Sequence, residues 1–263
     1  MMERENEEKQ MSAVGRTLAI LEALSKEESI NLEHLAKATG LPKATLLRFL
    51  STLISLGYVY RDDGDKYHLT LKMFSIGSRS LNHIDLVSTA KPFTKALSRE
   101  LGETVHMGIR EDDEAVYLLK DESQYTIRMY SRVGKAIPLY CTAIGKIFLS
   151  AMSEDELNEY LASHNLKPFT PKSIRSADAL RKELQLIKDR GWSIDDEEHE
   201  ENIMCIGAPV KDYTGDVVAA ISVSWPLFRF DNENLNKIIK KITTSAKEIS
   251  KILGYTEEIY ENN

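Results

Sequence analysis

Long apolar runs are missing from this sequence, and cysteine is scarce. The 263 residues contain only two cysteines, Cys141 and Cys205. Two cysteines are too few for a disulfide scaffold or for a cysteine-based zinc site. No segment approaches the roughly 18 consecutive apolar residues of a membrane span, and the acidic, polar first ten residues lack the apolar core of a secretory signal. These absences exclude a membrane protein and a small secreted domain, so we expect a cytoplasmic protein.

The composition is typical of a folded globular protein. Hydrophobic residues make up 42% and charged residues 29%, with a formal net charge of −7. At about 100–200 residues per domain, the length predicts two domains or one large one. The net negative charge argues against an affinity of the whole protein surface for nucleic acid. It does not exclude a local basic face that binds nucleic acid. From Pro42 to Arg61 the chain carries Lys43, Arg48 and Arg61 and no acidic residue.

Residues 12–71 have the local signals of a winged helix-turn-helix. Residues 1–11 form a charged arm that we expect to be disordered. Capping side chains, a helix-ending glycine and a proline suited to a first helical turn delimit three short helices: these residues are Ser12, Asn31, Gly40 and Pro42. Two short alternating segments around an Asp-Asp-Gly-Asp turn predict a β-hairpin at 58–69. Three helices followed by a hairpin predict a DNA-binding domain.

The third of these helices has a polar face that fits the major groove, where the first half of such a helix reaches base edges. The candidates for base or phosphate contact on it are Lys43, Ala44, Thr45, Arg48 and Thr52. Three further cations are candidates for phosphate contacts beside the groove: Arg16, Arg61 and Lys66. An isolated polar helix face would be explained by solvation alone, and Lys66 is equally well an ordinary surface lysine. The position between a helix-turn-helix and a wing favours DNA contact.

The rest of the chain mixes helices and strands and predicts an α+β fold. Residues 72–90 are expected to form a linker helix, residues 91–254 the second domain and residues 255–263 a tail. Apolar faces on the first helix and the linker exceed what so small a domain can bury alone, which predicts dimer contacts there. Strands are predicted at 104–110, 115–120, 126–133 and 217–225. Helices are predicted at 142–152, at 177–190 and after Asp231.

Three stretches resemble the IclR family of bacterial transcriptional regulators. They are Val14–Leu21 with Gly40–Thr45, Ser131–Lys146 and Gly191–Val210. The chain departs from the family pattern at Lys211, where an aromatic residue or histidine is usual, and at 201–202, where many members have Pro-Gly. The resemblance covers about residues 12–253. It implies a GAF-like effector-binding domain, homodimers that pair into tetramers, a small carboxylate effector and a roughly palindromic DNA operator with half-sites about one helical turn apart.

Within the family, the resemblance implies a repressor of pectin and hexuronate catabolism genes. Its effector would be a 2-keto sugar acid, 2-keto-3-deoxygluconate, which would release the repressor from DNA.

The chain also offers groups that suit such an effector. Free backbone N–H groups at the first helical turn, Ala143 and Ile144, form an anion site for a carboxylate. By resemblance, four side chains also line the pocket: Asp195, Cys205, Ser222 and Ser224. A carboxylate accepts hydrogen bonds from hydroxyl groups, and alternate residues of one strand share a face. The simpler alternatives are a plain buried cysteine and serines that only satisfy backbone groups.

Motifs of cofactor and metal chemistry are missing. The chain has no dinucleotide-binding glycine motif, no Walker A, no H-E-x-x-H and no G-x-S-x-G. The residues His106, Cys141, His199 and Cys205 match no compact ligand spacing. We therefore expect no cofactor, no metal and no enzymatic activity. The alternative is a small-molecule-binding or hydrolytic enzyme with an N-terminal helical interaction module, which would be favoured if the first domain failed to bind DNA.

Overall fold

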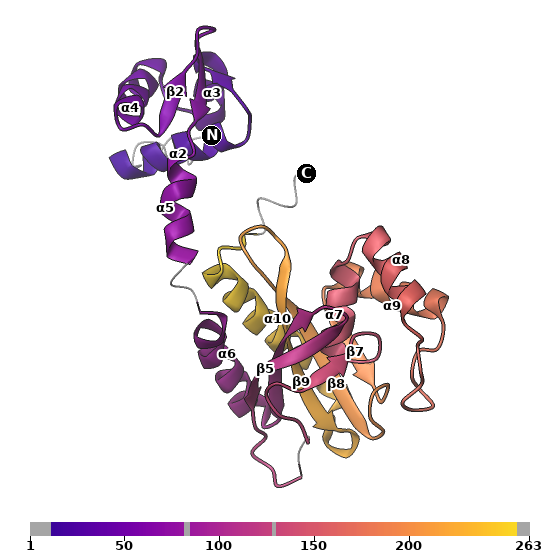
Figure 1. Ribbon diagram of the computed structural model, residues 1–263. Coiled ribbons are helices and arrows are strands. Elements are labelled where there is room, and N and C mark those ends of the chain that lie inside the picture. Colours follow the sequence, from indigo (N-terminus) through magenta and orange to yellow (C-terminus); the bar gives the residue numbers. More distant parts are fainter. Residues whose placement is uncertain (1–11, 82–84, 128–129, 257–263) are drawn as a thin grey trace. The chain divides into compact units, whose positions relative to one another are not determined.

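The computed structural model describes residues 12–81, 85–127 and 130–256. The chain divides into two compact units, Met1–Ile84 and Asp85–Asn263 (Figure 1). Each unit has its own hydrophobic core. The predicted arm at 1–11 and most of the predicted tail lie outside the described residues. None of the helices in the described ranges combines the length and apolarity that a membrane span requires.

The first unit contains the three predicted short helices, α2 (Ala13–Ser25), α3 (Leu32–Thr39) and α4 (Lys43–Ser55). Their ends are set by side chains and backbone within a few residues. The Ser12 hydroxyl accepts a hydrogen bond from the N–H of Gly15, and the Asn31 side chain accepts one from the N–H of His34. Gly40 ends α3 in the left-handed conformation with φ 70°. Pro42 lies one residue before α4, at its N-cap, instead of in its first turn.

The wing is a small antiparallel sheet. The predicted hairpin consists of β2 (Val59–Arg61) and β3 (Lys66–Leu69), and an unpredicted strand, β1 (Ile30–Asn31), pairs with β3 on its other side. Asp62 organises the turn, because its Oδ1 accepts hydrogen bonds from the backbone N–H of Gly64 and Lys66 at 2.9 Å. Its Oδ2 lies 2.8 Å from Nε2 of His68. Two hydrogen bonds lower the pKa of Asp62: the one with His68 has the larger effect, and the one from the N–H of Lys66 has the next largest.

The predicted linker helix at 72–90 is not continuous. Helix α5 (Lys72–Leu81) belongs to the first unit, and α6 (Leu86–Leu101) begins the second. The physical reason is a new helix start at Asp85, whose side chain accepts hydrogen bonds from the N–H and the hydroxyl of Ser88. An N-cap of this kind fixes where a helix begins. The division between the two units therefore falls inside the segment predicted as one helix.

The second unit is built on a six-stranded antiparallel sheet with the order β6-β5-β4-β9-β8-β7. Its strands are β4 (Thr104–Glu111), β5 (Glu114–Asp121), β6 (Ala136–Pro138), β7 (Ser193–Asp196), β8 (Ile203–Lys211) and β9 (Val217–Pro226). The strand predicted at 126–133 is wrong for the described part of that segment, which carries no strand. A turn closed by the hydrogen bond from the N–H of Lys135 to the carbonyl of Arg132 lies at the end of this segment, and the next strand, β6, begins only after it.

Helices cover both faces of this sheet. Residues of α6 and α10 (Leu235–Ile252) pack on one face, whose core includes Val105, Ile206 and Val223. Helix α7 (Ala143–Ala151) lies on the other face and packs against α9 (Ala177–Arg190). Helix α8 (Glu154–Ser163) follows α7 and begins with a capping box formed by Ser153 and Glu156. Two short 3₁₀ turns, η1 (Leu227–Arg229) and η2 (Asn232–Asn234), precede α10. Asp231 caps η2, so the predicted cap lies one short turn before the long helix.

Candidate DNA-binding face and effector-binding site

Helix α4 is anchored by one face and exposes the other. Leu46, Leu50 and Leu53 are buried in the core of the first unit. The predicted contact residues lie on the opposite side: Lys43, Ala44, Arg48 and Thr52 are exposed, and Thr45 is half-buried. This face also exposes Leu47, which the sequence analysis missed although it stands four residues after Lys43. The helix therefore presents cationic, hydroxyl and apolar groups together, the mixture that base edges and thymine methyl groups accept.

The three cations predicted beside the groove have different surroundings. Arg16 on α2 is half-buried, and Lys66 at the start of β3 is exposed. Arg61 is paired with Asp65 across the wing turn at 2.7 Å, and both side chains are largely in solvent. An exposed pair of this kind contributes little stability, so Arg61 remains available to a phosphate. The assignment of these residues to DNA stays a prediction.

The candidate effector site is a polar patch on the sheet face covered by α7. Residues that pair across antiparallel strands point to the same face, and the register defines two adjacent rows of side chains on that face. The first row contains Asp195, Cys205, Ser224 and Thr104, and the second contains Ser193, Gly207, Ser222 and His106. Within the first row, the Cys205 thiol lies 3.1 Å from the Ser224 hydroxyl. The register thus brings four of the predicted effector residues together.

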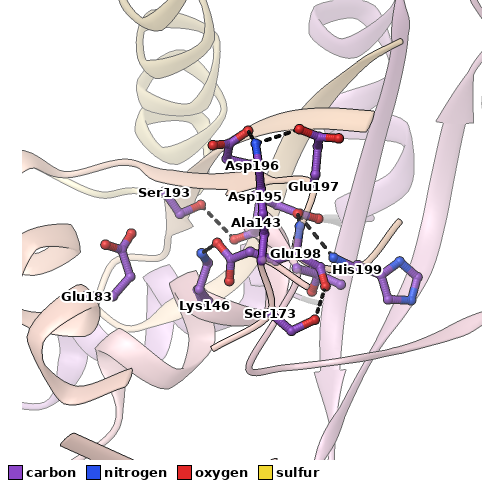
Figure 2. Close-up of polar contacts among 12 residues, drawn as sticks. Ala143, Lys146, Ser173, Glu183, Ser193, Asp195, Asp196, Glu197, Glu198 and His199 are labelled. Carbon is purple, nitrogen blue, oxygen red and sulfur yellow. Dashed lines mark hydrogen bonds and ion pairs between the residues drawn. The ribbon is translucent and has the colours of Figure 1, made fainter. Parts of the chain in front are cut away.

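Gly207 lets the start of α7 lie directly against this patch, and Gly145 lets it lie against the segment that precedes the helix. A Cβ on Gly207 would be 3.2 Å from the carbonyl group of Ala143, and one on Gly145 would be 2.3 Å from Cα of Leu139. The Ser193 hydroxyl donates to the Ala143 carbonyl at 2.7 Å, which fixes the helix on the sheet (Figure 2). The N-cap Thr142 accepts from the N–H of Gly145. The preceding N–H groups, those of Ala143 and Ile144, have no intrahelical partner, so the helix start offers them to an anion.

Asp195 is a buried carboxyl group between this helix and the following loop. Its Oδ1 accepts hydrogen bonds from the backbone N–H of Glu198 at 2.8 Å and of His199 at 3.3 Å (Figure 2). Burial raises the pKa of Asp195 to about 7, and the positive charge of Lys146 opposes this effect. A carboxyl group that titrates near neutral pH can accept a hydrogen bond from a hydroxyl group or, when protonated, donate one.

Lys146 and Glu198 form a buried ion pair beside Asp195. The Lys146 side chain is 0% exposed, and its Nζ contacts Oε1 of Glu198 (Figure 2). The other carboxylate oxygen, Oε2, has no hydrogen-bond partner among the described residues. Burial raises the pKa of Glu198, while Lys146 lowers it. This pair was not predicted from the sequence, in which the one signal is that Lys146 is the only charged residue of α7, a helix whose other side chains except Ser150 are apolar.

The raised pKa of Asp195 predicts a pH-dependent stability. In the unfolded chain the carboxyl has a pKa near 3.8, against about 7 in the fold. The folded protein therefore holds the proton more tightly, so its stability falls as the pH rises between these two values. Asp195→Asn has no such proton to lose. We expect the variant to gain about 2–4 kcal/mol relative to the wild type between pH 4 and pH 8, measured by urea unfolding. A pH-independent difference would contradict the assignment.

All six predicted effector residues are buried. Two prominent hollows in the described part of the chain lie elsewhere: one of about 390 Å³ beside Glu103 and Arg229, and one of about 360 Å³ beside Glu114. Neither hollow is lined by any of the six predicted effector residues. No group of three or more potential ligand side chains in the described ranges is placed to hold a metal ion. The site is thus a closed polar layer between α7 and the sheet.

A winged helix-turn-helix joined to an α/β unit with a buried polar layer defines a ligand-responsive transcriptional regulator. Comparison with family models agrees for both units. Residues 13–63 match the IclR helix-turn-helix domain, and residues 78–251 match the bacterial transcriptional regulator IclR C-terminal domain. The chain belongs to the IclR family, a family of DNA-binding transcriptional regulators and not of enzymes. The enzymatic alternative is therefore excluded as an account of this chain.

Relatives and solved structures support this assignment over nearly the whole chain. The chain is 39% identical over 246 residues to the HTH-type transcriptional regulator KdgR of Escherichia coli, covering 93% of this chain and 94% of that protein. It is similar to the Thermotoga maritima IclR structure with a TM-score of 0.63 at 32% identity, covering 94% and 100%. The C-terminal domain of E. coli KdgR matches with a TM-score of 0.60 at 36% identity, covering 65% of this chain and 100% of that domain.

Proposed function

We propose that this regulator is a repressor of pectin and hexuronate catabolism genes, released from its operator by the small 2-keto sugar acid 2-keto-3-deoxygluconate. The observation that carries the proposal is the contact between the start of α7 and the two polar rows of the sheet. The similarity to KdgR over almost the full length supports the choice of pathway.

The proposed binding mode follows the chemistry of the groups in the site. The effector carboxylate would bind the N–H groups of Ala143 and Ile144, where the helix dipole also favours negative charge. The hydroxyl groups of the sugar acid would bind Asp195, Ser222 and Ser224. Cys205 would contact the carbon chain as a small, weakly polar side chain. These contacts must differ between two states of the protein, because an effector that binds both states equally cannot change DNA affinity.

Operator binding would use a homodimer, and dimers would pair into tetramers. Exposed apolar side chains on α2 and at the start of α5 support a dimer contact there: they are Val14, Leu18, Leu71, Met73, Phe74 and Ile76. Two α4 helices related by a two-fold axis would contact the half-sites of a palindrome. The contacts would come from Lys43, Ala44, Thr45, Arg48 and Thr52. Arg16, Arg61 and Lys66 would bind phosphates.

Arg48→Ala tests the DNA-binding half of the proposal. A lost base or phosphate contact of about 1–3 kcal/mol should weaken operator binding roughly 5–150-fold, measured by fluorescence anisotropy at one stated salt concentration. Effector binding should be unchanged in calorimetry. Lys188→Ala removes an exposed cation from α9 in the second unit and serves as the matched control. Equal losses for both variants would mean that Arg48 makes no specific contact with DNA.

The proposed function as a whole is tested by binding fragmented genomic DNA with and without 2-keto-3-deoxygluconate. Selective retention of a palindromic site, released by the compound, is the expected result. Retention without release would discard the proposed effector and keep the regulator. Retention of no particular fragment would contradict the proposed repressor function.

A further inference from the structure

His106 on β4 is buried, and one of its two ring nitrogens has no hydrogen-bond partner within the part of the chain that the structure describes. The side chain is 0% exposed, and its Nε2 lies 2.7 Å from the hydroxyl of Ser131. Its Nδ1 has no hydrogen-bond partner among the described residues. Burying an unsatisfied polar atom costs about 1–3 kcal/mol. A buried polar atom of this kind calls for a specific explanation.

The imidazole ring is held in a defined orientation and protonation state. It stacks on the ring of Tyr117, with centroids 4.4 Å apart. Burial, together with the positive charges of Lys120 and Lys135, lowers the pKa of His106 to about 3, so the ring is neutral at pH 7. A neutral imidazole has one N–H and one lone pair. Because Ser131 engages Nε2, Nδ1 remains for one further hydrogen bond, as donor or acceptor according to the tautomer.

The position of His106 in the sheet connects it with the candidate effector site. His106 pairs with Ser222, which in turn pairs with Gly207, the residue on which the start of α7 lies. His106 is thus two strands away from Gly207, about 10 Å at the usual strand spacing.

We propose that His106 is a further effector-recognition residue, whose Nδ1 hydrogen-bonds a hydroxyl group of the sugar acid at the end remote from its carboxylate. This inference rests on the proposed function and deepens it, since it assigns the residue that distinguishes a long hydroxylated acid from a short one. A six-carbon acid anchored at the start of α7 spans two strands of the sheet. A three-carbon acid such as pyruvate does not reach His106.

Two variants of His106 separate the two ring nitrogens. Glutamine places a polar atom near the position of Nε2 and keeps the contact with Ser131, whereas asparagine places one near the position of Nδ1. Calorimetry on the full-length protein compares 2-keto-3-deoxygluconate with pyruvate. His106→Gln should weaken binding of the sugar acid about tenfold and leave pyruvate binding unchanged, while His106→Asn should retain most of the sugar-acid affinity.

A measurement on the wild type removes any dependence on how the variants fold. In protein labelled with ¹⁵N at histidine, 2-keto-3-deoxygluconate should shift the Nδ1 resonance of His106, and pyruvate should not. An unchanged resonance would overturn the assignment, because it would indicate an enclosed water at Nδ1 in place of the effector. Equal losses of affinity for both acids in His106→Gln would also overturn it. If the wild type binds neither acid, the proposed effector class is wrong and the role of His106 falls with it.

Discussion

Replacing Lys146 with methionine is expected to lower the free energy of unfolding by about 3–5 kcal/mol, because breaking a buried ion pair leaves an uncompensated charge. Lys146 is the cation next to two buried carboxyl groups, those of Glu198 and Asp195. Without it both carboxyl groups must stay protonated or move towards water. Urea unfolding of the full-length protein at pH 7.5 measures the loss. The loss should shrink at pH 5, where the carboxyl groups take up protons more readily.

Two controls make this test specific. The double variant Lys146→Met with Glu198→Leu removes both charges of the pair and should recover much of the stability, since an apolar replacement of a buried pair is often neutral or stabilising. Lys182→Met changes an exposed cation on α9 and should alter stability by no more than about 0.5 kcal/mol. If Lys146→Met behaves like Lys182→Met, the ion pair is not buried in solution.

The second large effect is expected from Gly145→Ala. The added Cβ would lie 2.3 Å from Cα of Leu139, whereas ordinary contact begins at 3.4 Å, so the start of α7 must shift by about 1.1 Å. Overpacking of this kind costs about 1–3 kcal/mol. The shift also carries the N–H groups of Ala143 and Ile144 away from the site. We therefore expect effector binding to weaken about a hundredfold, since misplacement of about 1 Å has effects of this size.

The phenotype of this variant distinguishes its cause. It should bind the operator as the wild type does and fail to be released by the effector, as operator binding with increasing 2-keto-3-deoxygluconate will measure. The matched control is Gly77→Ala in α5, where a Cβ would meet nothing within 4 Å. That change should stabilise the protein by up to about 1 kcal/mol. Normal release of Gly145→Ala would contradict a role for the start of α7 in effector binding.

The sequence predicted best those features that act over a few residues. Ser12, Asn31 and Gly40 set helix ends through bonds to backbone groups three or four positions away, so their spacing in the sequence was sufficient. The β-hairpin at 58–69 was predicted in the same way, from the residues of its turn. Local signals also misled, because the apolar pattern of the linker hid the new helix start at Asp85. The strand expected at 126–133 failed because pattern alone does not show where a turn ends.

The parts of the site that the sequence analysis missed depend on contacts between distant residues. Lys146 and Glu198 are 52 positions apart, and their pairing requires both the sheet order and the placement of α7. The requirement for glycine at 207 arises from the helix that crosses above it. The Nδ1 atom of His106 lacks a hydrogen-bond partner among the residues that the structure describes, and this follows only from its surroundings in three dimensions. No spacing rule along the chain expresses these relations.

The alternation of side chains along β8 and β9 has a consequence for how this regulator evolves. Cys205, Ser222 and Ser224 face α7, whereas their neighbours Ile206 and Val223 face the core under α6 and α10. A mutation at one of these polar positions therefore alters the chemistry of the face under α7, the proposed effector site, and spares the opposite apolar layer. With the effector bound at that face as proposed, selection can change the recognised compound one residue at a time, while descendants inherit the same folded scaffold and the same DNA-binding unit.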